Sequence, residues 1–412
     1  MKRVVYILLV ACLNVMGFHL HATPDTCHTD LSDDTVVPVG ASSSDAPKAS
    51  FVYDVDFETR FDNREFQGKS AFTPSMTVFG ARLTPQVGLL LKTSDGGMKN
   101  HNGASAGKKT SEHRLMLGVD IFKDFGSGKD LDLFREMTLY YNLRTKIAKT
   151  DFEMYAGVFP RRVMGTGLYS DAFFSDSLTF YDNNLEGLLL KFIREKAYFE
   201  VGCDWMGQYG QNRREKFMIF TAGEGKVLPF MSLGYAGYML HYANSVQVKG
   251  LIDNIMVNPY MRFDLASNVG LQTLSFRLGW LQAMQRDRKH VGEFVCPFGG
   301  EFDQEVRHWN VGVHNKMFFG HNMMPYYSGA DDAGFKYGSD LYYGDPFYRV
   351  HDDGSTGGGF YDRLEVYYEP QISDCLSIRV SALFHFNGTK YSGSQQIVGI
   401  RFNLNELISR RK

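Results

Sequence analysis

The fold of this chain is decided by DCLSIRVSALFHF, residues 374–386, and IVGIRFNL, residues 397–404. In both stretches apolar side chains alternate with polar or small ones, Leu383 being the one exception. A period of two residues is that of a β-strand with one apolar face and one water-facing face. The chain therefore ends in two amphipathic strands.

The same alternation recurs along the chain from residue 51 onward. In residues 51–61, Phe51, Tyr53 and Val55 share one face with further aromatics, and acidic and basic residues occupy the other. Further runs begin near residues 79, 115, 137, 151, 184, 196, 215, 228, 253, 271, 305 and 359. Together they make about 15 strands, many of them longer than the usual five or six residues of soluble proteins.

The connections predict one more strand. Short links at residues 148–149, 194–195, 223–225, 267–268 and 371–373 alternate with longer ones, and this rhythm breaks across residues 320–358. A strand around Phe335 to Tyr343 restores it and gives about 16, since single-chain bacterial barrels usually have an even number. The polar loop from Thr93 to Glu112 falls on the short-turn side and has no explanation in this scheme.

We therefore predict an all-β chain that forms a transmembrane antiparallel β-barrel of about 16 strands, with 14 to 18 left open. A soluble β-sandwich or propeller remains an alternative, because alternation does not say whether lipid or protein covers the apolar face.

The first residues have the pattern of an export signal. Lys2 and Arg3 precede an apolar run, and a cleavage site follows at Ala22. Residues 9–12 also match a lipoprotein box, so lipidation of Cys12 is an alternative to its removal. We expect a signal peptide over 1–22, a flexible leader over 23–49, the barrel over 50–404 and a short tail over 405–412.

Composition fits a barrel in a membrane. Aromatic residues make up 14% of the chain, mostly Tyr and Phe, as aromatic girdles at two membrane interfaces require. The formal net charge of −2 argues against a nucleic-acid partner. Export permits disulfides, but no C-x-x-C spacing links the cysteines of the mature chain, so their pairing stays open. These are Cys27, Cys203, Cys296 and Cys375.

With its export signal and recurring strands, the chain resembles the porin-like outer-membrane β-barrels of Gram-negative bacteria. Ile400, Phe402 and Leu404 resemble that family's C-terminal assembly signal, although eight residues follow Leu404. The resemblance implies a place in the cell outer membrane among its lipids, and recognition by the barrel-assembly machinery through the last strand. Trimers are common in the family, but nothing in the sequence singles out a subunit interface.

If lipid covers the apolar faces, the polar faces line the lumen. Charges of both signs on a wetted wall would select small polar solutes by size and charge. Alternatively they pair across strands and fill a narrow, plugged barrel. The predicted lumen-lining residues are Asp54, Glu58, Arg60, Arg82, Arg144, Glu153, Glu200, Asp204, Arg262, Asp264, Arg277, Arg363, Glu365, Arg379 and Arg401.

Two long segments, Phe159 to Asn184 and Leu341 to Asp362, are candidates for a constriction. Loops folded into a barrel bind the passing solute, and Tyr beside Arg and Asp suits sugars or other hydroxylated molecules. The alternative is that both are surface loops. The candidate constriction residues are Arg161, Arg162, Tyr181, Asp182, Tyr342, Tyr343, Asp345 and Arg349.

Signals for enzymatic chemistry are weak, and we predict no catalytic residue, metal or cofactor. His241, His385, Asp151 and Asp204 could serve a barrel hydrolase, but no local signature groups them. His308 and His314, placed on one strand, would lie about 20 Å apart, too far to share an ion.

The sequence thus predicts a porin-like channel for small polar solutes. Two alternatives stay open: a barrel enzyme acting on lipid or peptide, and a non-conducting surface scaffold.

Overall fold

Residues 49–67, 74–95, 109–129, 132–350 and 358–405 are described by the structure, a computed structural model. All of them fall within one compact unit, Pro47–Lys412. Their strands are β1 (Ala49–Phe66), β2 (Met76–Asp95), β3 (Lys109–Asp124), β4 (Asp132–Ile147), β5 (Thr150–Pro160), β6 (Asn184–Arg194), β7 (Ala197–Gly207), β8 (Lys216–Leu228), β9 (Met231–Tyr242), β10 (Ile252–Asp264), β11 (Thr273–Asp287), β12 (Phe298–His308), β13 (Val311–Gly320), β14 (Gly359–Tyr368), β15 (Leu376–Asn387) and β16 (Lys390–Asn405). The helical elements are η1 (Arg161–Val163), α2 (Asp176–Tyr181), α3 (Ala266–Val269), α4 (Gly338–Leu341) and η2 (Pro346–Tyr348).

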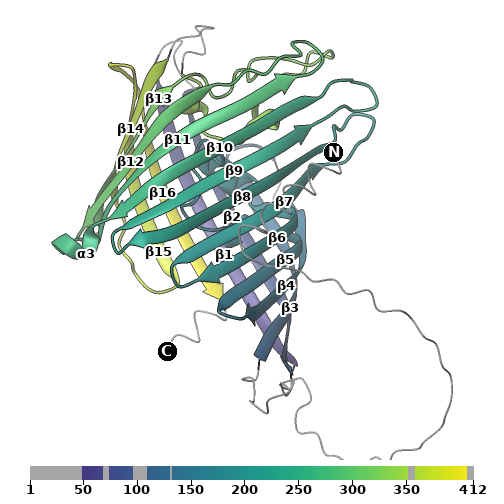
Figure 1. The fold of residues 1–412 in the computed structure, drawn as a ribbon, viewed down its shortest axis with the longest axis vertical. Helices are drawn as coiled ribbons and strands as arrows, with labels where there is room; N and C mark the ends of the chain where they lie inside the picture. The colour runs from purple at the N-terminus through teal and green to yellow at the C-terminus, as the bar shows by residue number, and fades with distance from the viewer. Residues whose placement is uncertain (1–48, 68–73, 96–108, 130–131, 351–357, 406–412) are drawn as a thin grey trace, which may run out of the picture. The chain divides into compact units, whose positions relative to one another are not determined.

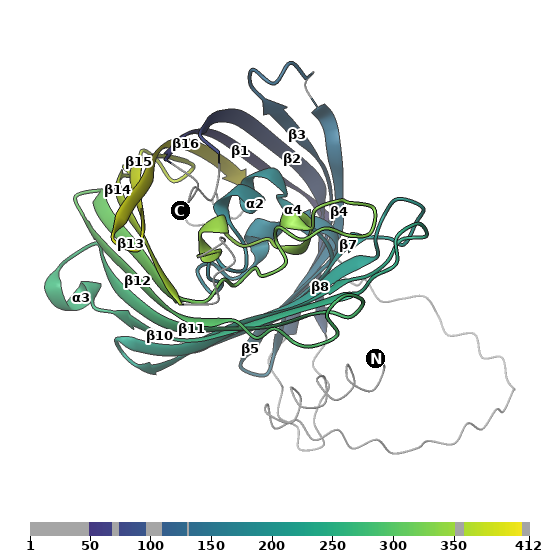
Figure 2. The ribbon, with the colours of Figure 1, turned by 90° about the horizontal axis from the view of Figure 1, so that it is seen from above.

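Each strand pairs antiparallel with its neighbours in sequence, and the first strand pairs with the last (Figure 1). In that closing pair Phe57 lies opposite Phe402, and Thr59 lies opposite Ile400. Figure 2 shows the resulting ring of strands from above. The prediction of a closed antiparallel barrel of about 16 strands is confirmed.

The period-two pattern separates the two faces of the wall. On β4, Met137 and Leu139 are 57% and 54% exposed on the outside, while Thr138 between them is fully buried inside. Val380 on β15 is likewise exposed, and the next residue, Ser381, is buried. The outside of the barrel is therefore apolar along most strands, as it is in a barrel that spans hydrocarbon.

The two ends of the barrel differ in their connections. Two-residue turns at 148–149, 195–196, 229–230 and 309–310 all fall at one end, which we call the short-turn end. The links over residues 161–183 and 321–358 both fall at the other, the long-link end. The predicted turns at 148–149 and near 194–195 are confirmed. The turn predicted at 223–225 is wrong, because those residues lie within β8.

The predicted strand around Phe335 to Tyr343 is also wrong, since that segment contains α4 and no strand. The missing strand comes from the run near residue 305, which is a hairpin of β12 and β13. Trp309 and Asn310 join them with φ of 48° and 65°, as a two-residue type I′ turn requires. Because β12 and β13 run in opposite directions, His308 and His314 are not on one strand as predicted.

Among the described residues no helix is long and apolar enough to cross a membrane. Cys203, Cys296 and Cys375 are free thiols. Cys12 and Cys27, the proposed signal peptide, most of the leader and the tail lie outside the described residues.

Candidate functional site

Two long links fold into the barrel instead of standing above it. We call residues 161–183 the first inserted loop and residues 321–350 the second inserted loop. Figure 2 shows α2 of the first and α4 of the second within the ring of strands. Both predicted constriction segments therefore reach the lumen, and the alternative of surface loops does not hold for their described parts.

Buried polar contacts hold the first inserted loop against the wall. Arg161, whose side chain is 4% exposed, pairs with Asp204 of β7 at 3.3 Å. The backbone N–H of Gly165 donates to Glu200 of β7 at 2.9 Å. Asp204 and Glu200, two of the predicted lumen-lining residues, thus anchor this loop.

Asp171 of the first inserted loop pairs with two cations of the wall. Its carboxylate lies 2.6 Å from Lys316 Nζ on β13 and 2.7 Å from the Arg363 guanidinium on β14. Burial by itself would raise the pKa of Asp171, but these two cations lower it to about 2. The loop is therefore fixed to the wall by an ionised carboxylate between two buried cations.

The second inserted loop is anchored through hydrogen bonds and through ion pairs, such as that of Asp331 with Arg214 of the β7–β8 link at 2.7 Å. Tyr348 donates to Glu301 of β12 at 2.7 Å, and Asn254 of β10 donates to the carbonyl of Leu341 at 3.1 Å. Tyr348 and Leu341 are completely buried, as core side chains are. The second inserted loop therefore packs against the inner wall as densely as side chains pack in a protein core.

The two inserted loops also bind each other. The N–H of Ser175 donates to the carbonyl of Tyr343 at 2.8 Å, and that of Asp345 to the carbonyl of Asp171 at 2.7 Å. A Cβ at Gly344 would lie only 2.1 Å from the carbonyl oxygen of Ala172, so only glycine permits this approach. The loops form one body across the lumen.

A cavity of about 490 Å³, the first cavity, lies at the long-link end between this body and the wall. Arg60 and Arg64 of β1 and Arg363 of β14 line it from the wall. Tyrosines and carboxylates line it from the loops. These are Asp176, Tyr181, Asp182, Tyr327, Tyr342, Tyr343 and Asp345.

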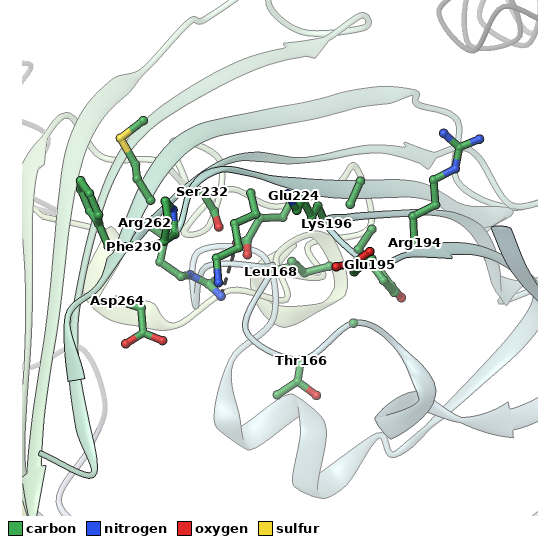
Figure 3. Close-up of a pocket in the computed structure, with 16 residues that line it drawn as sticks. Thr166, Leu168, Arg194, Glu195, Lys196, Glu224, Phe230, Ser232, Arg262 and Asp264 are labelled. Atoms are coloured by element: carbon green, nitrogen blue, oxygen red, sulfur yellow. Dashed lines mark ion pairs between the residues drawn. The ribbon is translucent and has the colours of Figure 1, made fainter. Parts of the chain in front are cut away.

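A second cavity, of about 450 Å³, opens at the short-turn end (Figure 3). Its lining includes the turn residues Glu195, Lys196 and Phe230, and Thr166 and Leu168 of the first inserted loop. Arg262 of β10 crosses this space to pair with Glu224 of β8 at 3.4 Å. The inserted loops thus have a polar cavity at either end.

Among the predicted lumen residues, one group meets the loops or the cavities. Arg60 lines the first cavity, and Arg262 and Asp264 line the second. Asp54 binds Arg162, and Arg277 donates to the carbonyl of Leu168 at 3.0 Å. Together with Glu200, Asp204 and Arg363, they surround the inserted loops.

The other predicted lumen residues pair with charges on their own or neighbouring strands. The pairs are Arg82 with Asp120 at 3.5 Å, Arg144 with Glu153 at 3.4 Å, Arg379 with Glu365 at 2.8 Å, and Arg401 with Glu58 at 3.1 Å. The sequence left two alternatives for these charges, that they line the lumen or that they pair across strands, and the structure contains both.

Five of the eight predicted constriction residues line the first cavity: Tyr181, Asp182, Tyr342, Tyr343 and Asp345. The three arginines have other positions. Arg161 and Arg162 fix the base of the first inserted loop, and the Arg349 guanidinium lies 3.9 Å from the centre of the Tyr327 ring.

The sequence analysis missed Lys316 and Asp303, which pair at 3.4 Å, and Asp171. Lys316 lies on β13, where the alternation would have shown it to face the lumen if the hairpin had been divided at Trp309. Asp171 carries no such signal, because a loop has no period from which to read orientation.

The residues considered for a hydrolase are not brought together. His241 stacks on Phe217 on the outer face of β9, with ring centres 4.8 Å apart, whereas His385 is buried inside β15. Asp151 is exposed at a turn. Within the described ranges there is no group of three or more His, Cys, Asp or Glu residues that could hold a metal ion.

Comparison with protein-family models and with curated proteins finds no match. Solved structures of similar fold include OccD3 of Pseudomonas aeruginosa, which is 9% identical with a TM-score of 0.43, covering 86% of this chain and 91% of that one. Another is OmpT, an outer membrane protein of Vibrio cholerae in its trimer form, at 8% identity and a TM-score of 0.47, covering 86% and 99%. A third is OccAB4 of Acinetobacter baumannii, at 8% and 0.39, covering 88% and 100%.

Likenesses this remote say nothing about what the chain binds or passes. The closed barrel of β1 to β16 does give it the fold that the resemblance to porin-like outer-membrane barrels predicted.

Proposed function

We propose that this chain is a porin-like channel in the outer membrane of a Gram-negative bacterium, and that it passes small polar solutes. The observation that carries the proposal is a water-facing lumen with a polar cavity at each end of the inserted loops, inside a barrel whose outside is apolar. In this proposal, residues 1–22 direct export, β16 is read by the assembly machinery, and the predicted lumen charges line the solute pathway.

The outside of the barrel supports placement among outer-membrane lipids. Leu89, Leu115 and Leu139 are each more than half exposed on neighbouring parts of the wall, and a soluble protein would not leave so broad an apolar surface in water. Tyr53 and Tyr368 are exposed at the short-turn ends of β1 and β14, where an aromatic girdle would lie.

The lining of the first cavity suits a hydroxylated, ring-shaped solute such as a sugar. Tyrosine rings offer flat apolar faces together with hydroxyl groups, and the arginines and carboxylates offer charged donors and acceptors. Charges of both signs line this cavity, with Arg60 and Arg64 on the wall and Asp176 and Asp182 on the first inserted loop. Such a lining favours neutral polar molecules that hydrogen-bond to both sides.

Current through single molecules in planar lipid bilayers tests the channel function. We expect stepwise insertions, each with a small steady conductance, because the inserted loops narrow the lumen. If the correctly folded barrel passes no ions, the channel function is rejected and the non-conducting surface scaffold remains.

Replacing Tyr181 by alanine should weaken block of the current by added sugars. Tyr181 lines the first cavity, so its loss removes an aromatic face at the solute. We expect roughly tenfold weaker binding, the result of losing about 1.4 kcal/mol of interaction. Titrating glucose and maltose against the ion current measures this. Tyr391→Ala is the control, because Tyr391 is 45% exposed at the start of β16 and lines neither cavity. If sugar block weakens equally in both variants, Tyr181 does not line the solute pathway.

Acidification should make the channel more selective for anions. Burial raises the pKa of Asp345 to about 6, with nearby Asp171 adding to the rise and Arg363 opposing it. The carboxyl is ionised above this pKa and neutral below it, so the first cavity loses negative charge between about pH 7.5 and about pH 5. In a salt gradient, the reversal potential should therefore shift towards that of an anion-selective channel as the pH falls.

The variant Asp345→Asn isolates this effect from the other ionisable side chains that line the cavity. At both pH values its reversal potential should be close to the anion-selective value that the unaltered protein reaches at about pH 5. Most of the change in reversal potential with pH should therefore vanish in this variant. A step of unchanged size in Asp345→Asn would assign the titration to another group.

A further inference from the structure

Two lysines lie opposite each other at the short-turn end of the barrel, where β7 pairs with β8. The backbone N–H of Lys226 donates to the carbonyl of Lys196 at 2.7 Å, which continues the register that places Ala197 opposite Gly225. Side chains of directly opposite residues lie on the same face of a sheet. Both lysines line the second cavity, so this face is the lumen side.

The charges of these two lysines are not balanced by an ion pair. Like charges directly opposite each other destabilise a pair of strands. At the same end of the barrel, Lys146 of β4 lies opposite Asp151 of β5 and pairs with it at 3.5 Å. Within the part of the chain that the structure describes, neither Lys196 nor Lys226 pairs with a carboxylate in this way. The second cavity is therefore lined by two neighbouring ammonium groups that can bind an anion.

Another pair of opposed cations in the lumen shows what balances such charges. Lys316 of β13 lies opposite Arg363 of β14, and the Asp171 carboxylate lies 2.6 Å from one and 2.7 Å from the other. A second carboxylate approaches each cation, Asp303 at 3.4 Å from Lys316 and Asp345 at 3.5 Å from Arg363. More than one negative charge thus surrounds these two cations. By the same reasoning, a doubly charged anion suits Lys196 and Lys226.

The remaining lining of the second cavity suits a hydroxylated molecule. Glu195 and Asp264 provide carboxylates, which accept hydrogen bonds from hydroxyl groups, and Phe230 provides an aromatic face (Figure 3). A third carboxylate, Glu224, is already paired with Arg262 at 3.4 Å. Acceptors for hydroxyl groups therefore lie in the same cavity as the two lysines.

The first inserted loop covers the second cavity towards the lumen. On one side, the N–H of Gly165 donates to Glu200 of β7 at 2.9 Å. On the other, Arg277 of β11 donates to the carbonyl of Leu168 at 3.0 Å. Both Gly165 and Leu168 line the cavity, which lies between these two attachments. A ligand would therefore enter and leave it from the short-turn end.

We propose that the second cavity binds a phosphorylated sugar or polyol, with its phosphate between Lys196 and Lys226. A phosphomonoester carries close to two negative charges at neutral pH, as two ammonium groups require. The hydroxyl groups of the ligand donate to Glu195 and Asp264, and its carbon skeleton packs on Phe230. The cavity volume of about 450 Å³ lies within the range of pockets that hold small molecules.

This binding goes beyond the proposed channel function and does not depend on it. Because the ligand uses one end of the barrel only, a barrel that passes no ions could still bind it. In the proposed outer membrane the short-turn end faces the periplasm, so the ligand would be a periplasmic solute.

Isothermal titration calorimetry of the full protein in detergent tests the site. Glucose 6-phosphate should bind with one site per chain. Exchanging both lysines, in the variant Lys196→Met with Lys226→Met, should weaken this binding by roughly tenfold or more, because hydrogen bonds between charged groups are lost. Lys146→Met is the matched control, since Lys146 is an exposed lysine at the same end that lines neither cavity. Its affinity for glucose 6-phosphate should equal that of the unaltered protein.

Two further probes identify the charged group of the ligand. The second pKa of a phosphomonoester is about 6, so lowering the pH from about 7.5 to about 5 should weaken binding of glucose 6-phosphate several-fold. Glucuronate carries a single negative charge throughout this range. It should bind more weakly at about pH 7.5, and any change in its affinity measures titration of the cavity's own carboxylates.

The contact with the sugar is tested by Phe230→Ala. This variant should weaken binding of glucose 6-phosphate and leave binding of inorganic phosphate unchanged, because only the sugar packs on the ring. Arg60→Gln removes a cation of the first cavity and should leave the affinity for glucose 6-phosphate unchanged.

Four results would contradict the proposal. Binding of glucose 6-phosphate that survives exchange of both lysines would show that the anion does not lie between them, and equal losses in Lys146→Met would reduce the effect to overall charge. Loss of binding in Arg60→Gln would place the phosphate in the first cavity. Glucuronate that binds as tightly as glucose 6-phosphate at about pH 7.5 would make the ligand a carboxylate instead.

Discussion

Excising residues 324–347 is expected to raise the single-channel conductance several-fold. A barrel of this strand number is wide enough for an aqueous channel, but the second inserted loop fills its middle with buried side chains such as Leu341 and Phe347. The ends of the excised segment are close, because the N–H of Met323 donates to the carbonyl of Tyr348 at 3.0 Å. A Gly-Gly-Ser link can therefore join them without moving β13 or β14.

The control for this excision is removal of Gln211 and Asn212, which are exposed in the link between β7 and β8. It shortens a connection at the same end of the barrel without touching either inserted loop. Its conductance should match that of the unaltered protein. If the excised protein migrates as a folded barrel in electrophoresis without heating and its conductance does not rise, the inserted loops are not what narrows the lumen.

Replacing Asp171 by alanine is expected to be the most destabilising single substitution of a charged residue in the lumen. It leaves the Lys316 and Arg363 side chains, 7% and 8% exposed, without their shared carboxylate. Breaking a buried ion pair by removing one partner costs about 3 to 5 kcal/mol. We expect about 3 kcal/mol, the lower end of that range, because Asp303 and Asp345 remain within 3.4 Å and 3.5 Å of the two cations.

The free energy of unfolding, from reversible urea titration in lipid vesicles, measures this loss. The current should also become noisier, because the first inserted loop is no longer fixed to β13 and β14. Asp176→Ala is the matched control: the same substitution, in the same loop, at a carboxylate that lines the first cavity. It should change stability by no more than about 0.5 kcal/mol. Similar losses in both variants would show that Asp171 does not anchor the loop.

Much of the wall could be predicted from the sequence, because strand orientation is a local property. Each residue of a strand points opposite to its neighbours, so Leu139 outside and Thr138 inside follow from the pattern alone. The same rule placed Arg82, Glu200 and Arg363 on the inner face, where they contact other polar groups.

The local pattern failed where turn chemistry gave no signal. Trp309 is 81% exposed and adopts a positive φ, yet tryptophan is not a residue that marks a type I′ turn. The hairpin of β12 and β13 was therefore read as one strand, and Lys316 was lost from the predicted lumen. The strand then missing was sought in Phe335 to Tyr343, where apolar and aromatic residues belong to a loop packed inside the barrel.

The sequence by itself predicted the strands of a barrel and most of the side chains that face its lumen, because alternation acts between neighbouring residues. Only the tertiary structure decided that two links fold inward and leave a cavity on either side. That decision depends on contacts between residues far apart in the chain, such as Asp171 with Arg363, which are 192 residues apart. No periodicity within a loop encodes such a contact, because a loop side chain takes its direction from the groups it meets.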